Sequence, residues 1–244
     1  MKELPDNPSR SLMQAVRNFE KGRYKIAARL CRKELRRSPN DYFALCWYAN
    51  SLFALGRHND REAELVYHQA VNINPNHPLA HAGLGIIHYS NAVRLVRESH
   101  IPGFPETIWV TFHDELSPEE RKSKSSGIFI SRADCECGNR KVAINELEEA
   151  AKLTNDKDDQ IDFLMKAAEI HCLIDNKSAI KAYEKVLHIV PGYVPAHFDL
   201  AGCYAATGNS EMALKEYKLI KEKAPEDAED LRKILAEHNI EIKE

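Results

Sequence analysis

Apolar residues recur along this chain every three or four positions, in stretches that are separated by short polar turns. This spacing predicts amphipathic helices rather than strands. The stretches come in pairs that close on a proline, and the closing prolines are 36, 116 and 34 residues apart: Pro39, Pro75, Pro191 and Pro225. Because 116 is two periods of 34 plus 48 further residues, the pattern predicts an array of helix pairs with additional sequence in its middle.

The last pair shows the pattern most clearly, in the sequence LAGCYAATGNSEMALKEYKLIKEKAP over residues 200–225. Ala201 lies where helix A and helix B of the pair should cross, and Gly208 lies at the predicted turn. Ala213 and Tyr217 follow on the inner face of helix B. These residue types at this spacing resemble the tetratricopeptide repeat. The resemblance implies an all-α fold, a tetratricopeptide-type α-solenoid in which neighbouring helix pairs stack.

The repeat frame covers the chain apart from its first few residues and one segment, so residues 1–244 are expected to form one superhelical domain. It predicts five repeats and a C-terminal capping helix, at 8–41, 42–77, 78–157, 161–193 and 194–227, with the cap at 226–238. The third repeat is divided, with helix A at 77–92 and helix B at 139–153. Its helices should cross at Leu84 and Gly85, and Gly138 is predicted as the turn glycine.

About 46 residues within the third repeat, 92–137, are a predicted insertion. TIWVTFH (107–113) and GIFIS (127–131) are β-branched and aromatic, which favours a small hairpin. SPEE (117–120) between them matches the start of a short helix. We consider three placements: the insertion folds over the groove of the array, packs on the edge of the array, or contacts a partner or a second copy of the chain.

The DCEC sequence (134–137) raises the question of a metal site. Cys135 and Cys137 together with His100 and His113 would form a two-Cys, two-His set, which zinc accepts. Cys-x-Cys is not the usual chelating spacing, however, and the two histidines precede the cysteines. We therefore predict ordinary turn residues at 134–137, with no metal and no cofactor.

By the resemblance, helix A of each repeat lines a concave groove that is wide enough for an extended peptide or a single helix. The predicted groove is apolar and aromatic, and its candidate partner-binding residues are Phe43, Trp47, Asn50, Phe53, Leu79, Ile86, Tyr89, Met165, Lys166, Phe198 and Asp199. A charge clamp for a C-terminal carboxylate, which the resemblance makes possible, is not expected. Leu12, Val16, Leu79 and Gly83 occupy the positions where that clamp has basic residues and an amide.

Asn50 is the strongest polar candidate in this groove, because an amide can donate to and accept from a ligand backbone at once. A solvated surface amide is the alternative. Trp47 and Phe53 are either anchors for a partner or core residues between helix pairs. If the groove assignment holds, Trp47→Ala or Tyr89→Ala should weaken partner binding without unfolding the array.

Composition limits the function further. The chain has no Gly-rich phosphate loop, no HExxH and no GxSxG, so we do not expect an enzyme. No apolar run approaches the roughly 20 residues that span a bilayer, and the N-terminus lacks the apolar core of a signal peptide. Six scattered cysteines suit buried thiols in a reducing compartment. The sequence thus predicts a cytoplasmic, non-catalytic scaffold that binds a protein or peptide partner.

Charge is unevenly distributed although the net charge is only −3. Residues 1–40 hold eleven Lys or Arg and four acids, and part of this excess follows one helix through Arg29, Arg32, Lys33 and Arg36. A solvated face and a site for an acidic protein partner both fit. Nucleic acid is not the expected partner, because no aromatic residues are interleaved for base stacking. Head-to-tail self-assembly, basic N-terminus to acidic remainder, is the alternative function.

Overall fold

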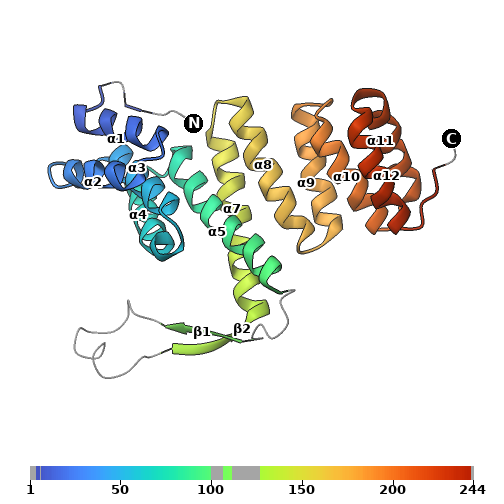
Figure 1. Ribbon diagram of the computed structural model, residues 1–244, viewed down its shortest axis with the longest axis horizontal. Coiled ribbons are helices and arrows are strands. Elements are labelled where there is room, and N and C mark those ends of the chain that lie inside the picture. Colours follow the sequence, from blue (N-terminus) through green and yellow to red (C-terminus); the bar gives the residue numbers. More distant parts are fainter. Residues whose placement is uncertain (1–3, 6, 100–106, 112–126, 243–244) are drawn as a thin grey trace.

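The computed structural model describes residues 4, 5, 7–99, 107–111 and 127–242, with the backbone alone at 93–99, 107–111 and 127–138. Its helices stand side by side in a curved row, with α1 to α4 at one end and α10 to α12 at the other (Figure 1). The predicted all-α solenoid is confirmed. The helices are α1 (Arg10–Glu20), α2 (Tyr24–Leu35), α3 (Tyr42–Ala54), α4 (Asp60–Ile73), α5 (Pro78–Ser99), α7 (Arg132–Leu153), α8 (Lys157–Cys172), α9 (Asn176–Ile189), α10 (Val194–Ala206), α11 (Ser210–Lys223) and α12 (Pro225–Glu237).

Local signals start and end these helices. The side chain of Asp41 accepts a hydrogen bond from the backbone of Ala44, and Asp175 accepts one from Ser178, so both aspartates cap helix N-termini. Asp156 caps α8 in the same way, which is why α8 begins at Lys157. The predicted turn glycine Gly208 has a φ of +77°, a left-handed conformation that favours glycine.

Helix order sets which helices face inward. The first helices of successive repeats touch one another: α1 contacts α3, α3 contacts α5, and α5 contacts α8. Successive second helices (α2, α4, α7, α9 and α11) make no contacts of similar extent among the described residues. An array whose helices are closer on one side curves toward that side. The first helices therefore line the inner face.

Small residues allow the paired helices to approach closely. Ala201 is fully buried at the predicted crossing in the last repeat. At Gly85 in the third repeat, a Cβ atom would lie 2.7 Å from Cγ of Leu147 on α7. The core is divided into three clusters along the row, and α5 contributes to two of them, Leu84 to one and Ala82 to the next. The packing of α5 therefore connects the hydrophobic cores of neighbouring repeats.

The insertion leaves the row between α5 and α7. Its two strands, β1 (Thr107–Thr111) and β2 (Gly127–Ser131), pair antiparallel with Trp109 opposite Phe129, as a hairpin requires. Figure 1 shows the hairpin beyond the ends of α5 and α7, away from the row of helices. The expected helix at 117–120 lies outside the described residues.

Two predictions about this segment were wrong. Gly138 is not a turn glycine and 134–137 are not turn residues, because α7 begins at Arg132 and includes them all. Helix B is longer than the repeat frame requires. The physical reason is that α5 is also prolonged, to Ser99, so the two helices continue to pack on each other past the point where a repeat normally turns.

A buried histidine ties the two helices together in the third and fifth repeats. Nδ1 of His197 lies 2.6 Å from Oε2 of Glu216 on α11, and Nε2 lies 2.9 Å from the carbonyl oxygen of Pro191. His81 does the same with Glu146 and Pro75, at 2.7 and 2.9 Å. The carbonyl only accepts, so Nε2 donates to it. The hydrogen bond that its ring makes to the Glu146 carboxylate raises the pKa of His81.

Candidate functional site

The inner face of the array is joined by side chains that cross from one first helix to the next. The rings of Phe19 and Trp47 lie edge to face with centroids 5.3 Å apart, which joins α1 to α3. Tyr89 on α5 donates a hydrogen bond to Glu169 on α8. These contacts join neighbouring first helices at two places along the inner face.

The structure brings the predicted groove residues onto these helices with different degrees of burial. Three are buried, namely Trp47, Leu79 and Met165. The others are half-buried: Phe43, Asn50, Phe53, Ile86, Tyr89, Lys166, Phe198 and Asp199. Lys166 forms an ion pair with Asp162 on its own helix. The half-buried set keeps part of each side chain available to a partner.

Trp47 is part of the core between helix pairs. Its side chain is 6% exposed and packs in the first core cluster. Removal of a buried indole leaves a cavity and costs several kcal/mol. Trp47→Ala is therefore expected to destabilise the array, and it is not a clean test of binding.

Asn50 is held in place by a tyrosine from the second helix of its repeat. The hydroxyl of Tyr67, which is 1% exposed, donates to Oδ1 of Asn50 over 2.6 Å. Gly83 makes this possible, because a Cβ atom there would overlap the ring of Tyr67. With Oδ1 engaged, Nδ2 is the end of the amide that has no hydrogen-bond partner among the described residues.

Two acidic residues, Glu169 on α8 and Asp199 on α10, lie close to each other on the same face in the second half of the array. Burial and the nearby Glu169 raise the pKa of Asp199 to about 6, although a hydrogen bond from Tyr183 opposes the shift. Tyr183 is 1% exposed and comes from α9, so it reaches the inner face as Tyr67 does from α4. The pair has no Lys or Arg ion-pair partner among the residues that the structure describes.

Tyr67 and Tyr183 are not among the predicted groove residues, because the repeat frame puts them on helix B, at the position that Tyr217 has in the last repeat. The sequence did contain a signal that these two tyrosines are equivalent. The two tyrosines are 116 residues apart, as are Pro75 and Pro191, so they occupy one repeat position. Glu169 also belongs to the site through its contacts with Tyr89 and Asp199.

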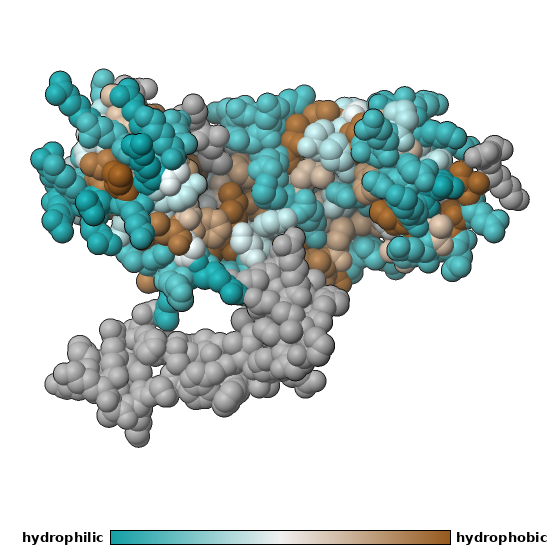
Figure 2. Space-filling model, viewed as in Figure 1, coloured by the Kyte–Doolittle hydropathy of each residue, from teal (hydrophilic) through white to brown (hydrophobic). Residues whose placement is uncertain are grey.

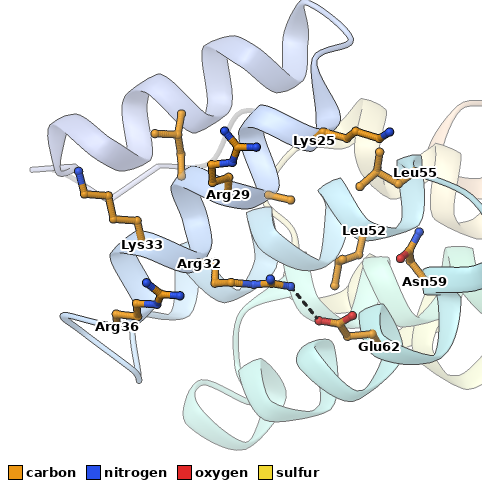
Figure 3. Close-up of a pocket in the computed structure, with 11 residues that line it drawn as sticks. Lys25, Arg29, Arg32, Lys33, Arg36, Leu52, Leu55, Asn59 and Glu62 are labelled. Atoms are coloured by element: carbon orange, nitrogen blue, oxygen red, sulfur yellow. Dashed lines mark ion pairs between the residues drawn. The ribbon is translucent and has the colours of Figure 1, made fainter.

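A second candidate site lies on the other side of the first repeats. A cavity of about 730 Å³ lies between α2, the end of α3 and the start of α4. Figure 3 shows the side chains that line it. Ala28, Leu52 and Leu55 contribute its apolar lining, and Glu62 is the only acid among the described residues that line it. The cations that line it come from α2 and from the residue that directly follows this helix: Lys25, Arg29, Arg32, Lys33 and Arg36.

Only one of these five cations has an acidic partner within the described part of the chain. Arg32 lies 3.6 Å from Glu62 and donates to the hydroxyl of Tyr48. With the residues that the structure places, no ion pair forms at Lys25, Arg29, Lys33 or Arg36. We call this set, together with its apolar lining, the cationic groove. It leaves four positive charges for an external anion.

The described surface offers no single large apolar patch in the orientation of Figure 1. Figure 2 shows hydrophobic residues in separate small patches between hydrophilic ones. None of the described helices combines the length and apolar character that a bilayer span requires. Within the described ranges, no three His, Cys, Asp or Glu residues are placed to hold a metal ion. His100 and His113 lie outside these ranges, so the two-Cys, two-His set that the sequence raised, and did not favour, stays untested.

The geometry agrees with comparisons to known proteins. The tetratricopeptide repeat family profile matches residues 175–237, which include α9, α10 and α11. Over these residues the chain is similar to the tetratricopeptide repeat family. No curated protein matches the chain.

Solved structures with this fold extend the likeness to nearly the whole chain. MamA is 16% identical, covers 96% of each chain and has a TM-score of 0.57. TTC0263, a thermophilic protein of this class from Thermus thermophilus, is 18% identical, covers 95% of this chain and 98% of its own, and has a TM-score of 0.50. YrrB, described as having an unusual peptide-binding site, is 14% identical over 85% of this chain and 91% of its own, with a TM-score of 0.51. At these identities the likeness concerns the fold.

Proposed function

We propose that this protein is a non-catalytic scaffold that binds a segment of a partner protein on the inner face of the array. The observation that carries the proposal is the anchored amide of Asn50. A buried tyrosine holds its oxygen, and its Nδ2 group is left to donate to a ligand backbone. The peptide-binding site of YrrB, a protein of the same fold, supports this class of function.

Apolar contacts would supply most of the affinity. Phe43, Phe53, Ile86 and Phe198 are half-buried and pack against the core with part of each side chain exposed. Covering such surface contributes about 25 cal/mol per Å² before the entropy of ordering a peptide is subtracted. The buried thiols of Cys31 and Cys46 suit a reducing compartment, and we propose that the protein is cytoplasmic.

The test begins with a peptide selected on the intact chain from a random display library. Asn50→Ala and Tyr89→Ala should each weaken its binding about 5- to 30-fold, the effect of losing one hydrogen bond or one aromatic anchor. Lys181→Ala is the matched control, because Lys181 is exposed on the outer helix α9. Unchanged affinity in both inner-face variants, by fluorescence anisotropy, contradicts the proposal.

The cationic groove supports a second candidate, a site for an acidic amphipathic segment. Lys25, Arg29 and Lys33 follow one another at four-residue intervals on α2, so they form one ridge about 12 Å long. A helix with carboxylates at the same intervals would face this ridge. Leu52 and Leu55 in the lining would meet its apolar side.

A synthetic helical peptide with glutamate at every fourth position and leucine beside it is the probe. Arg29→Glu with Lys33→Glu should reduce its binding at least about tenfold, and the loss should shrink at high salt. Lys177→Glu with Lys181→Glu on α9 is the matched control, since both lysines are exposed with the same spacing. Equal losses in both variants would show a general charge effect and no groove.

Self-assembly through the same charges is separable from partner binding. Glu226 and Asp227 are exposed at the start of α12, at the opposite end of the row from α2. If a second copy occupies the cationic groove, light scattering at low salt should give a mass above one chain, and high salt should reduce it. A mass of one chain at both salt concentrations excludes this occupant.

A further inference from the structure

Two thiols from successive inner helices meet at the far end of the inner face. Cys172 is the last residue of α8, and Cys203 lies within α10, 31 positions later. Their Sγ atoms are 3.3 Å apart. Two separate repeats therefore present a dithiol at a single point.

The separation is close to what a covalent bond requires. A disulfide has an S–S distance of about 2.0 Å, so the sulfur atoms need to approach by roughly 1.3 Å. Rotation of the two side chains and a small shift of one helix end supply a movement of this size. Cys172 ends its helix, where the backbone is held by fewer hydrogen bonds than in the middle of a helix.

The two thiols differ in access and in acidity. Cys172 is half-buried, whereas Cys203 is only 4% exposed. Its hydrogen-bond contacts with the Cys203 thiol and the Tyr183 hydroxyl lower the pKa of Cys172, although burial and the acids Asp199 and Glu169 oppose the shift. The same bond raises the pKa of Cys203. Cys172 is therefore the thiol that reacts first, and Cys203 is placed behind it.

We propose that Cys172 and Cys203 are a reversible modification site, at which exchange with a small-molecule disulfide such as oxidised glutathione forms an intrachain disulfide. The Cys172 thiolate attacks one sulfur of oxidised glutathione, the S–S bond of the reagent breaks, and one glutathione thiolate leaves. The Cys203 thiolate then attacks Sγ of Cys172 and displaces the second glutathione. Two protein thiols are oxidised, one glutathione disulfide is reduced to two thiols, and the two protons go to the leaving thiolates.

The bond would change the inner face. Glu169 lies one turn before Cys172 on α8, and Asp199 lies one turn before Cys203 on α10. A disulfide would fix the spacing of these two helices and remove the contact at 3.7 Å between the Cys172 thiol and the Tyr183 hydroxyl. Formation of the bond does not depend on the proposed function. Its effect on partner binding rests on that function.

Intact-mass spectrometry tests the modification without any partner. The chain with Cys135→Ser and Cys137→Ser is incubated with oxidised glutathione, quenched with N-ethylmaleimide in denaturant and weighed. The expected product has lost two hydrogens and carries two maleimides, on the buried Cys31 and Cys46. Tryptic peptides 167–177 and 186–215 should be joined, and dithiothreitol should separate them.

Two variants make the result decisive. Cys203→Ser should stop at a glutathione adduct on Cys172, which shows the order of attack. Lys181→Cys places an exposed thiol on α9 and serves as the reference for reagent activity. If the reference thiol reacts while Cys172 and Cys203 stay reduced, or if both carry glutathione with no internal bond, the proposal is overturned.

A binding measurement then addresses the consequence. Oxidation should change the affinity for the display-selected peptide at least about fivefold, a typical size for coupling between sites, and dithiothreitol should reverse the change. Cys203→Ser should show no such difference. A disulfide that forms without any change in affinity confirms the modification and contradicts its effect on the inner face.

Discussion

In both the third and the fifth repeat, a buried histidine of the first helix contacts a glutamate of the second helix. The two repeats differ in the number of residues between this histidine and this glutamate. His81 and Glu146 are 65 residues apart, whereas His197 and Glu216 are 19 residues apart. The difference of 46 residues equals the length of the predicted insertion, 92–137. The extra residues enter at the A–B turn, and this contact lies at the other end of the helix pair. The third repeat thus contains its long insertion at the end of the helix pair that lacks the buried histidine–glutamate contact.

A second difference concerns the position two residues after each histidine. In the third repeat this residue is Gly83, and the ring of Tyr67 packs over it to reach Asn50. In the fifth repeat it is Asp199, which accepts a hydrogen bond from Tyr183. One position therefore decides whether the tyrosine of the preceding helix supports an amide or a carboxylate on the inner face.

The largest expected effect comes from breaking the histidine–glutamate contacts. His197→Ala should lower the free energy of unfolding by about 3 kcal/mol or more, because it leaves Glu216 as a buried charge without its partner. His81→Ala should cost less, about 1–2 kcal/mol, since the Glu146 side chain is 23% exposed and can be solvated. Urea denaturation of both variants measures the difference, and equal losses would show that burial of the glutamate is not the cause.

The glycines give the next largest effect. Gly83→Ala should destabilise the array by about 1–3 kcal/mol, because its methyl group overlaps the Tyr67 ring. Gly202→Ala on α10 is the matched control, since a Cβ atom there meets nothing within 4 Å. It should stabilise by up to about 1 kcal/mol through helix propensity. Thermal unfolding midpoints that shift in the same direction would contradict the comparison.

The carboxylate of the fifth repeat predicts a pH dependence. The pKa of Asp199 is about 6 in the folded chain, above its unfolded value of about 3.9. The native state therefore binds the proton more tightly, and stability falls as the pH rises from about 4 through 6. Asp199→Asn should raise the free energy of unfolding by about 1–2 kcal/mol at pH 8, after allowance for partial solvent exposure, and by nothing near pH 3.5. A gain that is independent of pH would show that ionisation is not its source.

Removal of the insertion should have the smallest effect. Deletion of residues 92–137 gives the third repeat the spacing of the fifth and leaves His81 and Glu146 in place. The free energy of unfolding should change by no more than about 1 kcal/mol, because the loop closes at the free end of the pair. Circular dichroism in urea measures this. A collapse of helicity would show that the insertion supports the array.

Much of the fold could be predicted because its signals are local. The position of Gly208 at a turn follows from its neighbours in sequence, and its φ of +77° agrees. Predictions failed at Gly138, where packing between two prolonged helices overrode a glycine signal. Trp47 shows the same limit at the candidate site. The sequence left a partner anchor and a core residue equally open, and the burial of the side chain within the first core cluster places it in the core.

The sequence by itself determined the class of array, since helix periodicity and turn chemistry depend on residues a few positions apart. The division into five repeats with one long insertion stays a prediction from the same signals. The tertiary structure alone decided which polar groups meet on the inner face. Tyr67 reaches Asn50, and Cys172 reaches Cys203, only because separate helices stack at a fixed distance. Such contacts join residues between 17 and 31 positions apart, where no local pattern reports the distance between side chains.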